Sequence, residues 1–151
     1  MIEIQIQEDL PADFDPGDLN AFIRKVLELA DVSPESDLSL IFTTDVEIQR
    51  LNRQYLETDA PTDVLSFTMD FDNPETGAPY LGDIVISVPT AARQAETGGH
   101  PLIEEIKLLV VHGVLHLLGH DHGEPDEKTA MWQIQEKILS ALEVQARPTD
   151  S

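Results

Sequence analysis

The chain has 151 residues, with nine basic against 29 acidic residues, which give a formal net charge of −20. This length suits one domain with a sizeable core, and the absence of cysteine excludes disulfides and thiolate metal ligands, which leaves histidine and carboxylate for any metal. The acidity argues against a general nucleic-acid binder and reflects either adaptation to salt or a basic partner, although a local patch could act once salt screens charges beyond about 10 Å.

Hydrophobic periodicity and capping signals predict the elements in chain order. They are a strand at 2–6, a helix from Pro16 to Ala30, a strand at 38–42, a helix through 48–55 behind a capping box of Thr44 and Glu47, strands at 64–67 and 84–87, and helices that begin at Pro89, Pro101 and Pro125. Turn-forming residues at 70–77 predict one long loop between the two later strands. The order indicates a single α+β domain over residues 1–145, in which about five helices cover a small mixed four-stranded sheet, with a disordered tail at 146–151.

The beginning of the chain has neither the basic region nor the apolar core of a signal peptide. No apolar stretch approaches the roughly 20 residues of a membrane span. We therefore expect a cytoplasmic protein that makes no contact with membranes.

Four of the five histidines fall within HGVLHLLGHDH at 112–122. At about 100° per residue, His112 and His116 lie roughly 40° apart around a helix and about 6 Å along it, close enough to share one ion. A continuous helix would carry His122 off this face, but Gly119 can adopt the left-handed conformation that ends a helix and lets the chain turn back. The spacing predicts a three-histidine metal site at the end of a buried helix, with an open fourth position, as is common for catalytic zinc. Nickel and iron are also compatible with three imidazoles.

A buried helix can also carry a single neutral histidine that is merely hydrogen-bonded. Two or more buried imidazoles without a shared partner would be costly to desolvate, which favours the metal site. The spacing matches the zinc-protease pattern HExxHxxGxxH as well, but Gly113 replaces the glutamate that activates water for peptide cleavage. The pattern thus keeps the metal ligands and argues against a peptidase.

Three segments carry a resemblance to a known family. They are HGVLHLLGHDH at 112–122, DAPTDVLSF at 59–67 and LGDIVIS at 81–87. Together they closely resemble the YbeY family, the bacterial endoribonucleases that are also called ribosomal RNA maturation factors. The resemblance covers most of the domain, but little of residues 7–36 and 144–151.

The resemblance implies a zinc-dependent, single-strand-selective endoribonuclease that acts in 16S ribosomal RNA 3′ end maturation and in ribosome quality control. It implies that His112, His116 and His122 are the ligands, and that ribosomal RNA and the small ribosomal subunit are the partners. Two alternatives stay open. One is a metal-dependent hydrolase of another ester or amide, and the other is a zinc-stabilised assembly factor without catalysis, whose acidic face docks a basic ribosomal protein.

Two positions depart from the family pattern. Leu56 stands where the family commonly has an arginine that could bind phosphate through two N–H groups. Arg53, one helical neighbour away, is either its substitute or a solvated surface residue. His120 stands where the family usually has tyrosine, and it is a spare ligand, a proton carrier or a surface residue. His100 precedes a helix start and is expected to be only a polar terminus.

The remaining motif residues have structural as well as functional interpretations. Thr62, Asp63 and Ser66 either shape the start of a strand or contact RNA. Asp83 either orients a ligand histidine or binds nearby backbone amides. Beyond the metal ligands, Arg53 and Asp83 are the catalytic candidates, and the pattern does not identify a general base.

Overall fold

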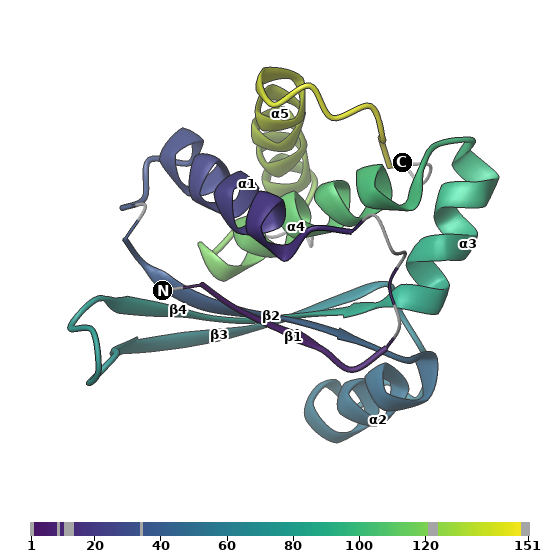
Figure 1. The fold of residues 1–151 in the computed structure, drawn as a ribbon, viewed down its shortest axis with the longest axis horizontal. Coiled ribbons are helices and arrows are strands. Elements are labelled where there is room, and N and C mark those ends of the chain that lie inside the picture. The colour runs from purple at the N-terminus through teal and green to yellow at the C-terminus, as the bar shows by residue number, and fades with distance from the viewer. Residues whose placement is uncertain (1, 9, 11–13, 34, 121–123, 149–151) are drawn as a thin grey trace.

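The computed structural model describes residues 2–8, 10, 14–33, 35–120 and 124–148, in which four strands and five helices form (Figure 1). In chain order they are β1 (Ile2–Ile6), α1 (Pro16–Leu29), β2 (Asp37–Thr43), α2 (Asp45–Leu56), β3 (Val64–Asp72), β4 (Pro79–Ser87), α3 (Val88–Gly98), α4 (Leu102–Leu117) and α5 (Pro125–Ala141). The elements follow the predicted order.

The strands form one mixed sheet in the order β1-β2-β4-β3. β1 and β4 both run parallel to β2, whereas β3 pairs antiparallel with β4. The register places Ile4 beside Leu40 and Leu40 beside Ile84, so the branched side chains of the three parallel strands share one face. The predicted α+β domain with a mixed four-stranded sheet is confirmed.

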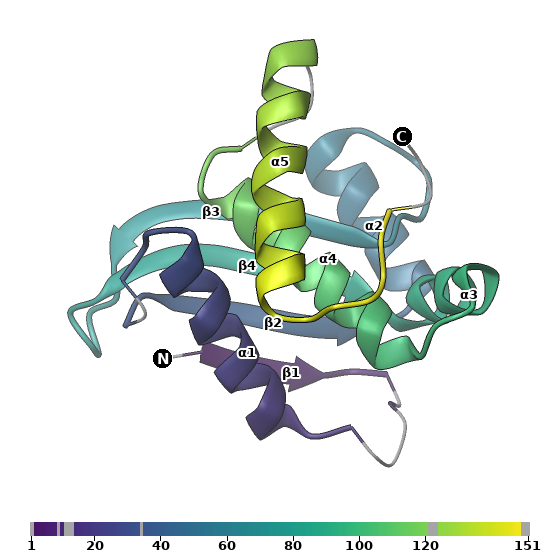
Figure 2. The same ribbon diagram turned by 90° about the horizontal axis from the view of Figure 1, so that it is seen from above.

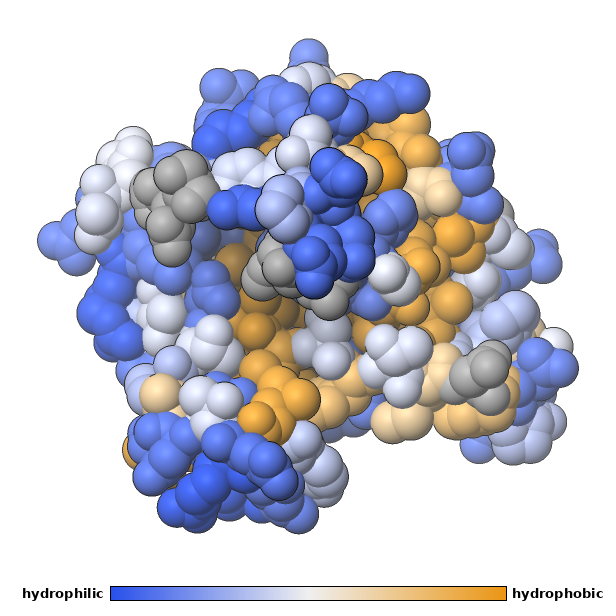
Figure 3. Space-filling model, turned by 180° about the vertical axis from the view of Figure 1, so that it is seen from behind, coloured by the Kyte–Doolittle hydropathy of each residue, from blue (hydrophilic) through white to orange (hydrophobic). Residues whose placement is uncertain are grey.

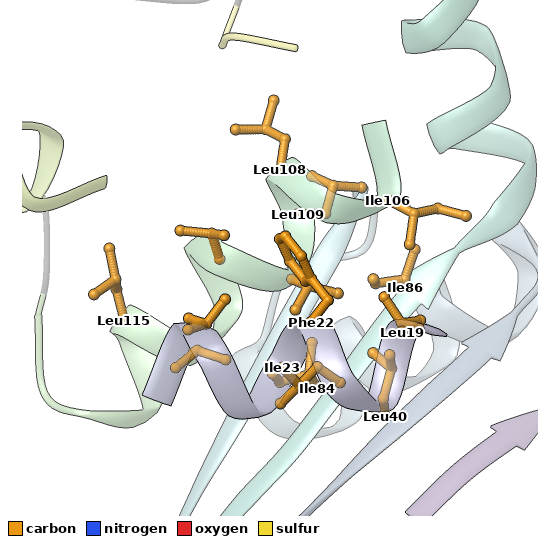
Figure 4. Packing of buried hydrophobic residues seen from close by; sticks show 14 of the residues in the cluster. Leu19, Phe22, Ile23, Leu40, Ile84, Ile86, Ile106, Leu108, Leu109 and Leu115 are labelled. Atoms are coloured by element: carbon orange, nitrogen blue, oxygen red, sulfur yellow. The ribbon is translucent and has the colours of Figure 1, made fainter. Parts of the chain in front are cut away.

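Helices cover the two faces of the sheet unequally (Figures 1 and 2). α1 and α4 lie on one face with α5 packed on α4, α3 lies at the end of the sheet beyond β4, and α2 lies alone on the opposite face. Apolar side chains of α1, α4, β2 and β4 meet between helices and sheet (Figure 4). Ten of the 16 residues of α4 are buried, so this helix belongs to the core, as predicted.

Side-chain caps begin two helices at the predicted positions. Asp15 accepts a hydrogen bond from the Gly17 N–H at 2.8 Å, and Thr44 accepts one from the Glu47 N–H at 3.2 Å. Each cap satisfies a backbone donor that has no partner inside its helix. Within the described chain, no helix is both long and apolar enough to span a membrane.

The predicted long loop between the later strands is wrong in its extent. β3 and β4 continue toward each other, so the connection is confined to 73–78. The buried carboxylate of Asp37 accepts hydrogen bonds from Asn73 Nδ2 at 2.8 Å and from Thr76 Oγ1 at 2.5 Å. This anchor ties the tip of a hairpin to the beginning of β2.

The chain packs beyond the predicted domain boundary at residue 145. Ala146 is 1% exposed, and Arg147 Nε lies 2.7 Å from Glu136 Oε2 on α5. The first two residues of the predicted tail are therefore packed against the domain. Residues 149–151 lie outside the described residues.

Candidate functional site

α4 carries His112 and His116 one turn apart, with their imidazoles in direct contact. Their Nε2 atoms lie 3.0 Å apart, and the rings meet edge to face with centroids 4.6 Å apart. Tetrahedral zinc bound by two imidazoles at about 2.0–2.1 Å would hold these nitrogens roughly 3.3 Å apart, so a small adjustment would let both bind one ion. The structure brings the two imidazoles together as the spacing predicts, and their role as metal ligands stays a prediction.

The predicted stop at Gly119 is confirmed. α4 ends at Leu117, and Gly119 has φ +94°. The Gly119 N–H donates to His116 O and the His120 N–H to Leu115 O, both at 3.0 Å, the hydrogen-bond pair of a Schellman motif. The chain therefore turns away from the helix axis after the histidine pair.

His122 is the third predicted ligand. His122 lies outside the described residues, as does the neighbouring Asp121. Among the residues that are described, no three histidine, cysteine or acidic side chains gather in a way that could hold a metal ion. The three-histidine site thus remains a prediction. Two of its three residues, His112 and His116, lie side by side in the structure.

A glutamine on α5 contacts His112, and its role could not be read from the sequence pattern. Gln135 is 2% exposed, and its Oε1 lies 2.9 Å from His112 Nδ1. It stands on a buried stripe with Met131 and Ile138, which are 0% and 1% exposed. The available signal was a polar amide inside an apolar helical stripe, because a buried polar group needs a hydrogen-bond partner.

β3 contacts α4 directly through Ser66. The Ser66 hydroxyl donates to the Gly113 carbonyl at 3.2 Å, between the two histidines in sequence. A Cβ on Gly113 would lie 2.8 Å from Ile84 Cγ2, so helix and sheet are packed too closely for a side chain there. The hydrogen bond of Ser66 agrees with a site-shaping role, which was one of the two interpretations of this residue. Position 113 has no room for the peptidase glutamate.

Thr62 and Asp63 brace the beginning of β3. Asp63 Oδ1 accepts from the Val64 N–H at 2.7 Å and from Thr62 Oγ1 at 3.3 Å. Its other oxygen accepts from Gln94 Nε2 at 3.3 Å, which links β3 to α3. These contacts support the structural interpretation of Thr62 and Asp63, and their contact with RNA stays a prediction.

Asp83 points to the sheet face opposite α4. Its neighbour Ile84 faces α4 at Gly113, and side chains alternate along a strand. Asp83 Oδ1 accepts from the Tyr80 hydroxyl at 2.6 Å, and Tyr80 also bonds to Ser39 at 2.7 Å. Burial and the bond to Asp83 raise the pKa of Tyr80. This placement argues against Asp83 orienting a histidine on α4.

α2 carries Arg53 and Leu56 on its outer surface. Arg53 is exposed, whereas Arg50 is held in an ion pair with Glu47 at 2.6 Å. Leu56 is 52% exposed, so the departure from the family pattern places an apolar side chain in solvent. Seen from behind, hydrophobic side chains gather toward the middle of the face, within a rim of mostly hydrophilic ones (Figure 3). Arg53 stays a candidate for substrate contact.

His100 is more than a polar terminus, which corrects the prediction for this residue. Its Nε2 lies 2.7 Å from Glu105 Oε1, and the two side chains are 12% and 6% exposed. Burial raises the pKa of Glu105, and the hydrogen bond from His100 opposes that shift. The pair joins the connection between α3 and α4 to the core. His120, by contrast, is half-buried just beyond the helix end, and its role stays open.

Fold and contacts together define a class of protein: an α+β domain that presents an imidazole pair from a buried helix. A family model described as "Endoribonuclease YbeY" matches residues 4–143. The chain belongs to this YbeY endoribonuclease family.

Curated relatives agree with this assignment, and one solved structure shares the fold. The chain is 40% identical over 145 residues to an Endoribonuclease YbeY of Mycobacterium sp. (strain KMS), across 91% of this chain and 82% of the relative. It is 38% identical over 159 residues to one of Mycobacterium ulcerans (strain Agy99), across 99% of this chain and 89% of the relative. A solution structure of a Thermotoga maritima protein matches with a TM-score of 0.55 at 21% identity, covering 100% of this chain and 99% of that chain. The last likeness concerns the fold alone.

Proposed function

We propose that this protein is a metal-dependent endoribonuclease that hydrolyses phosphodiester bonds of single-stranded RNA, with His112, His116 and His122 as ligands of one zinc ion. We further propose that it acts in the cytoplasm on ribosomal RNA of the small subunit, in 16S 3′ end maturation and ribosome quality control. Family membership supports the RNA substrate. The observation that carries the metal proposal is the 3.0 Å contact between the Nε2 atoms of His112 and His116.

The donor set suits this chemistry. Neutral imidazoles leave the full positive charge of a bound ion in place, and zinc so held would polarise a phosphoryl oxygen of the substrate. The chain itself positions the donors: α4 holds two of them one turn apart, Ser66 ties that helix to β3, and Gly119 ends it. Because residue 113 is a closely packed glycine, the site lacks the glutamate that activates water for peptide cleavage.

Metal analysis with a histidine variant tests the proposal. Native protein should contain about one zinc per chain, and removal by a chelator should abolish cleavage of single-stranded RNA until zinc is restored. His116→Ala should lose both the metal and the cleavage. His120→Ala is the matched control, since it removes an imidazole of the same motif that is not assigned as a ligand, and it should keep its zinc.

The outcomes separate the alternatives. Equal cleavage before and after metal removal would contradict the metal-dependent mechanism. Persistent cleavage by a folded His116→Ala variant would exclude His116 from the site. If native protein binds zinc and associates with ribosomes but cleaves no RNA, it is an assembly factor docked on a basic ribosomal protein, an interpretation that the net charge of −20 favours.

A further inference from the structure

We propose that Gln135 is a positioning residue, which holds His112 in the tautomer whose Nε2 is unprotonated, as a metal ligand must be. The inference rests on the proposed metal site and adds a residue from a different helix to it. Gln135 does not touch the proposed ion, since it contacts the far nitrogen of the ring. It acts through His112.

The contact is built into the core. α5 packs on α4, and the side chain of Gln135 is 2% exposed within the stripe formed by Met131 and Ile138. An amide buried there without a hydrogen bond would destabilise the fold. The carbonyl of Gln135 lies 2.9 Å from His112 Nδ1, which supplies that bond and fixes the ring plane.

The chemistry of the two atoms determines where the imidazole proton lies. A carbonyl oxygen only accepts hydrogen bonds, so with Oε1 of Gln135 facing the ring, Nδ1 of His112 carries the proton and donates it. A neutral imidazole has one such proton, so Nε2 is unprotonated and carries the electron pair of a possible ligand. This is the nitrogen that lies 3.0 Å from His116 Nε2, where both imidazoles would meet a shared ion. Gln135 therefore selects the nitrogen of His112 that binds.

Three variants on one helix test the inference through zinc affinity, measured by competition with a chromophoric chelator. Gln135→Met keeps the length of the side chain but removes the acceptor, and it should weaken zinc binding by about 10- to 100-fold. Gln135→Glu keeps an acceptor and removes the amide donor, so it should bind zinc about as well as the wild type. Gln133→Met makes the same exchange at an exposed position of α5 and should change nothing.

The outcomes distinguish this inference from the proposed function. Wild-type protein that binds no zinc would overturn the metal site itself. Wild-type binding that is matched by Gln135→Met would overturn only the role of Gln135. Loss of affinity in both Gln135→Met and Gln135→Glu would also overturn it, because the amide N–H would then be the donor and the opposite tautomer would be present.

A measurement on metal-free wild-type protein keeps the inference testable if Gln135→Met fails to fold. Nitrogen-15 spectra of the imidazoles report which ring nitrogen is protonated. We expect the proton of neutral His112 on Nδ1. A proton on Nε2 instead would overturn the proposed role, whatever the variants do.

Discussion

At the scale of single residues, Gly113 sets how closely α4 approaches the sheet. A Cβ at this position would lie 2.8 Å from Ile84 Cγ2 and 3.3 Å from two further atoms of the same side chain. Ile84 is fully buried and branched at Cβ, so it has little freedom to move away. The histidines on either side of Gly113 owe their distance from the sheet to this contact.

We expect Gly113→Ala to destabilise the protein, although alanine favours helices. Overpacking a well-packed core destabilises by about 1–3 kcal/mol, against a gain of about 1 kcal/mol in helix propensity. The melting temperature should fall by a few degrees, as thermal unfolding would measure. In the double variant with Ile84→Ala the two effects should be less than additive, because the second change removes the clashing atoms. A stabilised Gly113→Ala variant would contradict the packing argument.

Sequence reasoning reached some of these residues and not others for identifiable reasons. His112 and His116 follow from helical spacing alone, because two side chains four apart on one helix must be neighbours. Gln135 and His100 find their partners through tertiary packing and a connection between helices, and no local pattern specifies such contacts. Asp83 was identified as a candidate, but its face of the sheet was settled only by the contact of the neighbouring Ile84 with Gly113 on α4.

At the scale of elements, α4 ends because the backbone at Gly119 adopts a positive φ. Gly119 has φ +94°, and a Cβ there would lie within 4 Å of no atom of the described residues, so among these the conformation alone disfavours other residue types. Gly77, in the turn of the β3–β4 hairpin, has φ +75° and is equally open. The two glycines share a positive-φ conformation that would strain a residue with a Cβ, and they lie at different distances from the histidine pair.

Alanine at each glycine should therefore separate stability from metal binding. A left-handed conformation costs a residue with a Cβ about 1–2 kcal/mol, so Gly119→Ala and Gly77→Ala should lose similar stability in denaturant titrations. We expect only Gly119→Ala to weaken zinc binding as well, because it alters the exit of the chain toward His122. Equal zinc affinity in the two variants would argue against a metal site that uses residues beyond the turn.

The β3–β4 hairpin is the part of the fold whose extent the sequence pattern predicted wrongly. Turn formers at 70–77 predicted a long loop, yet the strands run to 72 and resume at 79. Pairing between β3 and β4 and the anchor at Asp37 override the weak strand propensity of aspartate and proline. The helices were predicted more closely, because their caps and prolines act locally at the residue that carries them.

At the scale of the whole molecule, the charge of −20 opposes an RNA substrate at long range. We expect kcat/KM for an unstructured single-stranded RNA to rise by up to about tenfold as salt is raised from low to moderate concentration, since screening removes repulsion between like charges. A basic nuclease would show the opposite trend, because salt competes for its phosphate contacts. Steady-state cleavage at several salt concentrations, with zinc content held constant, would measure this.

A shorter RNA provides the control for this prediction. Having fewer phosphates, it should be repelled less and should show a smaller rise with salt. If kcat/KM instead falls steadily with salt for both substrates, a local basic contact dominates association, and the exposed Arg53 would be the first residue to replace.

The order of strands in the sheet also affects which strands can pair most readily during folding. Both parallel pairings join strands that are separated by whole helices, whereas β3 and β4 are joined across only 73–78. Closing a short loop loses less chain entropy than closing a long one. β3, the strand whose Ser66 contacts the histidine helix, is therefore attached to the sheet by the pairing with the smallest entropic barrier to closure.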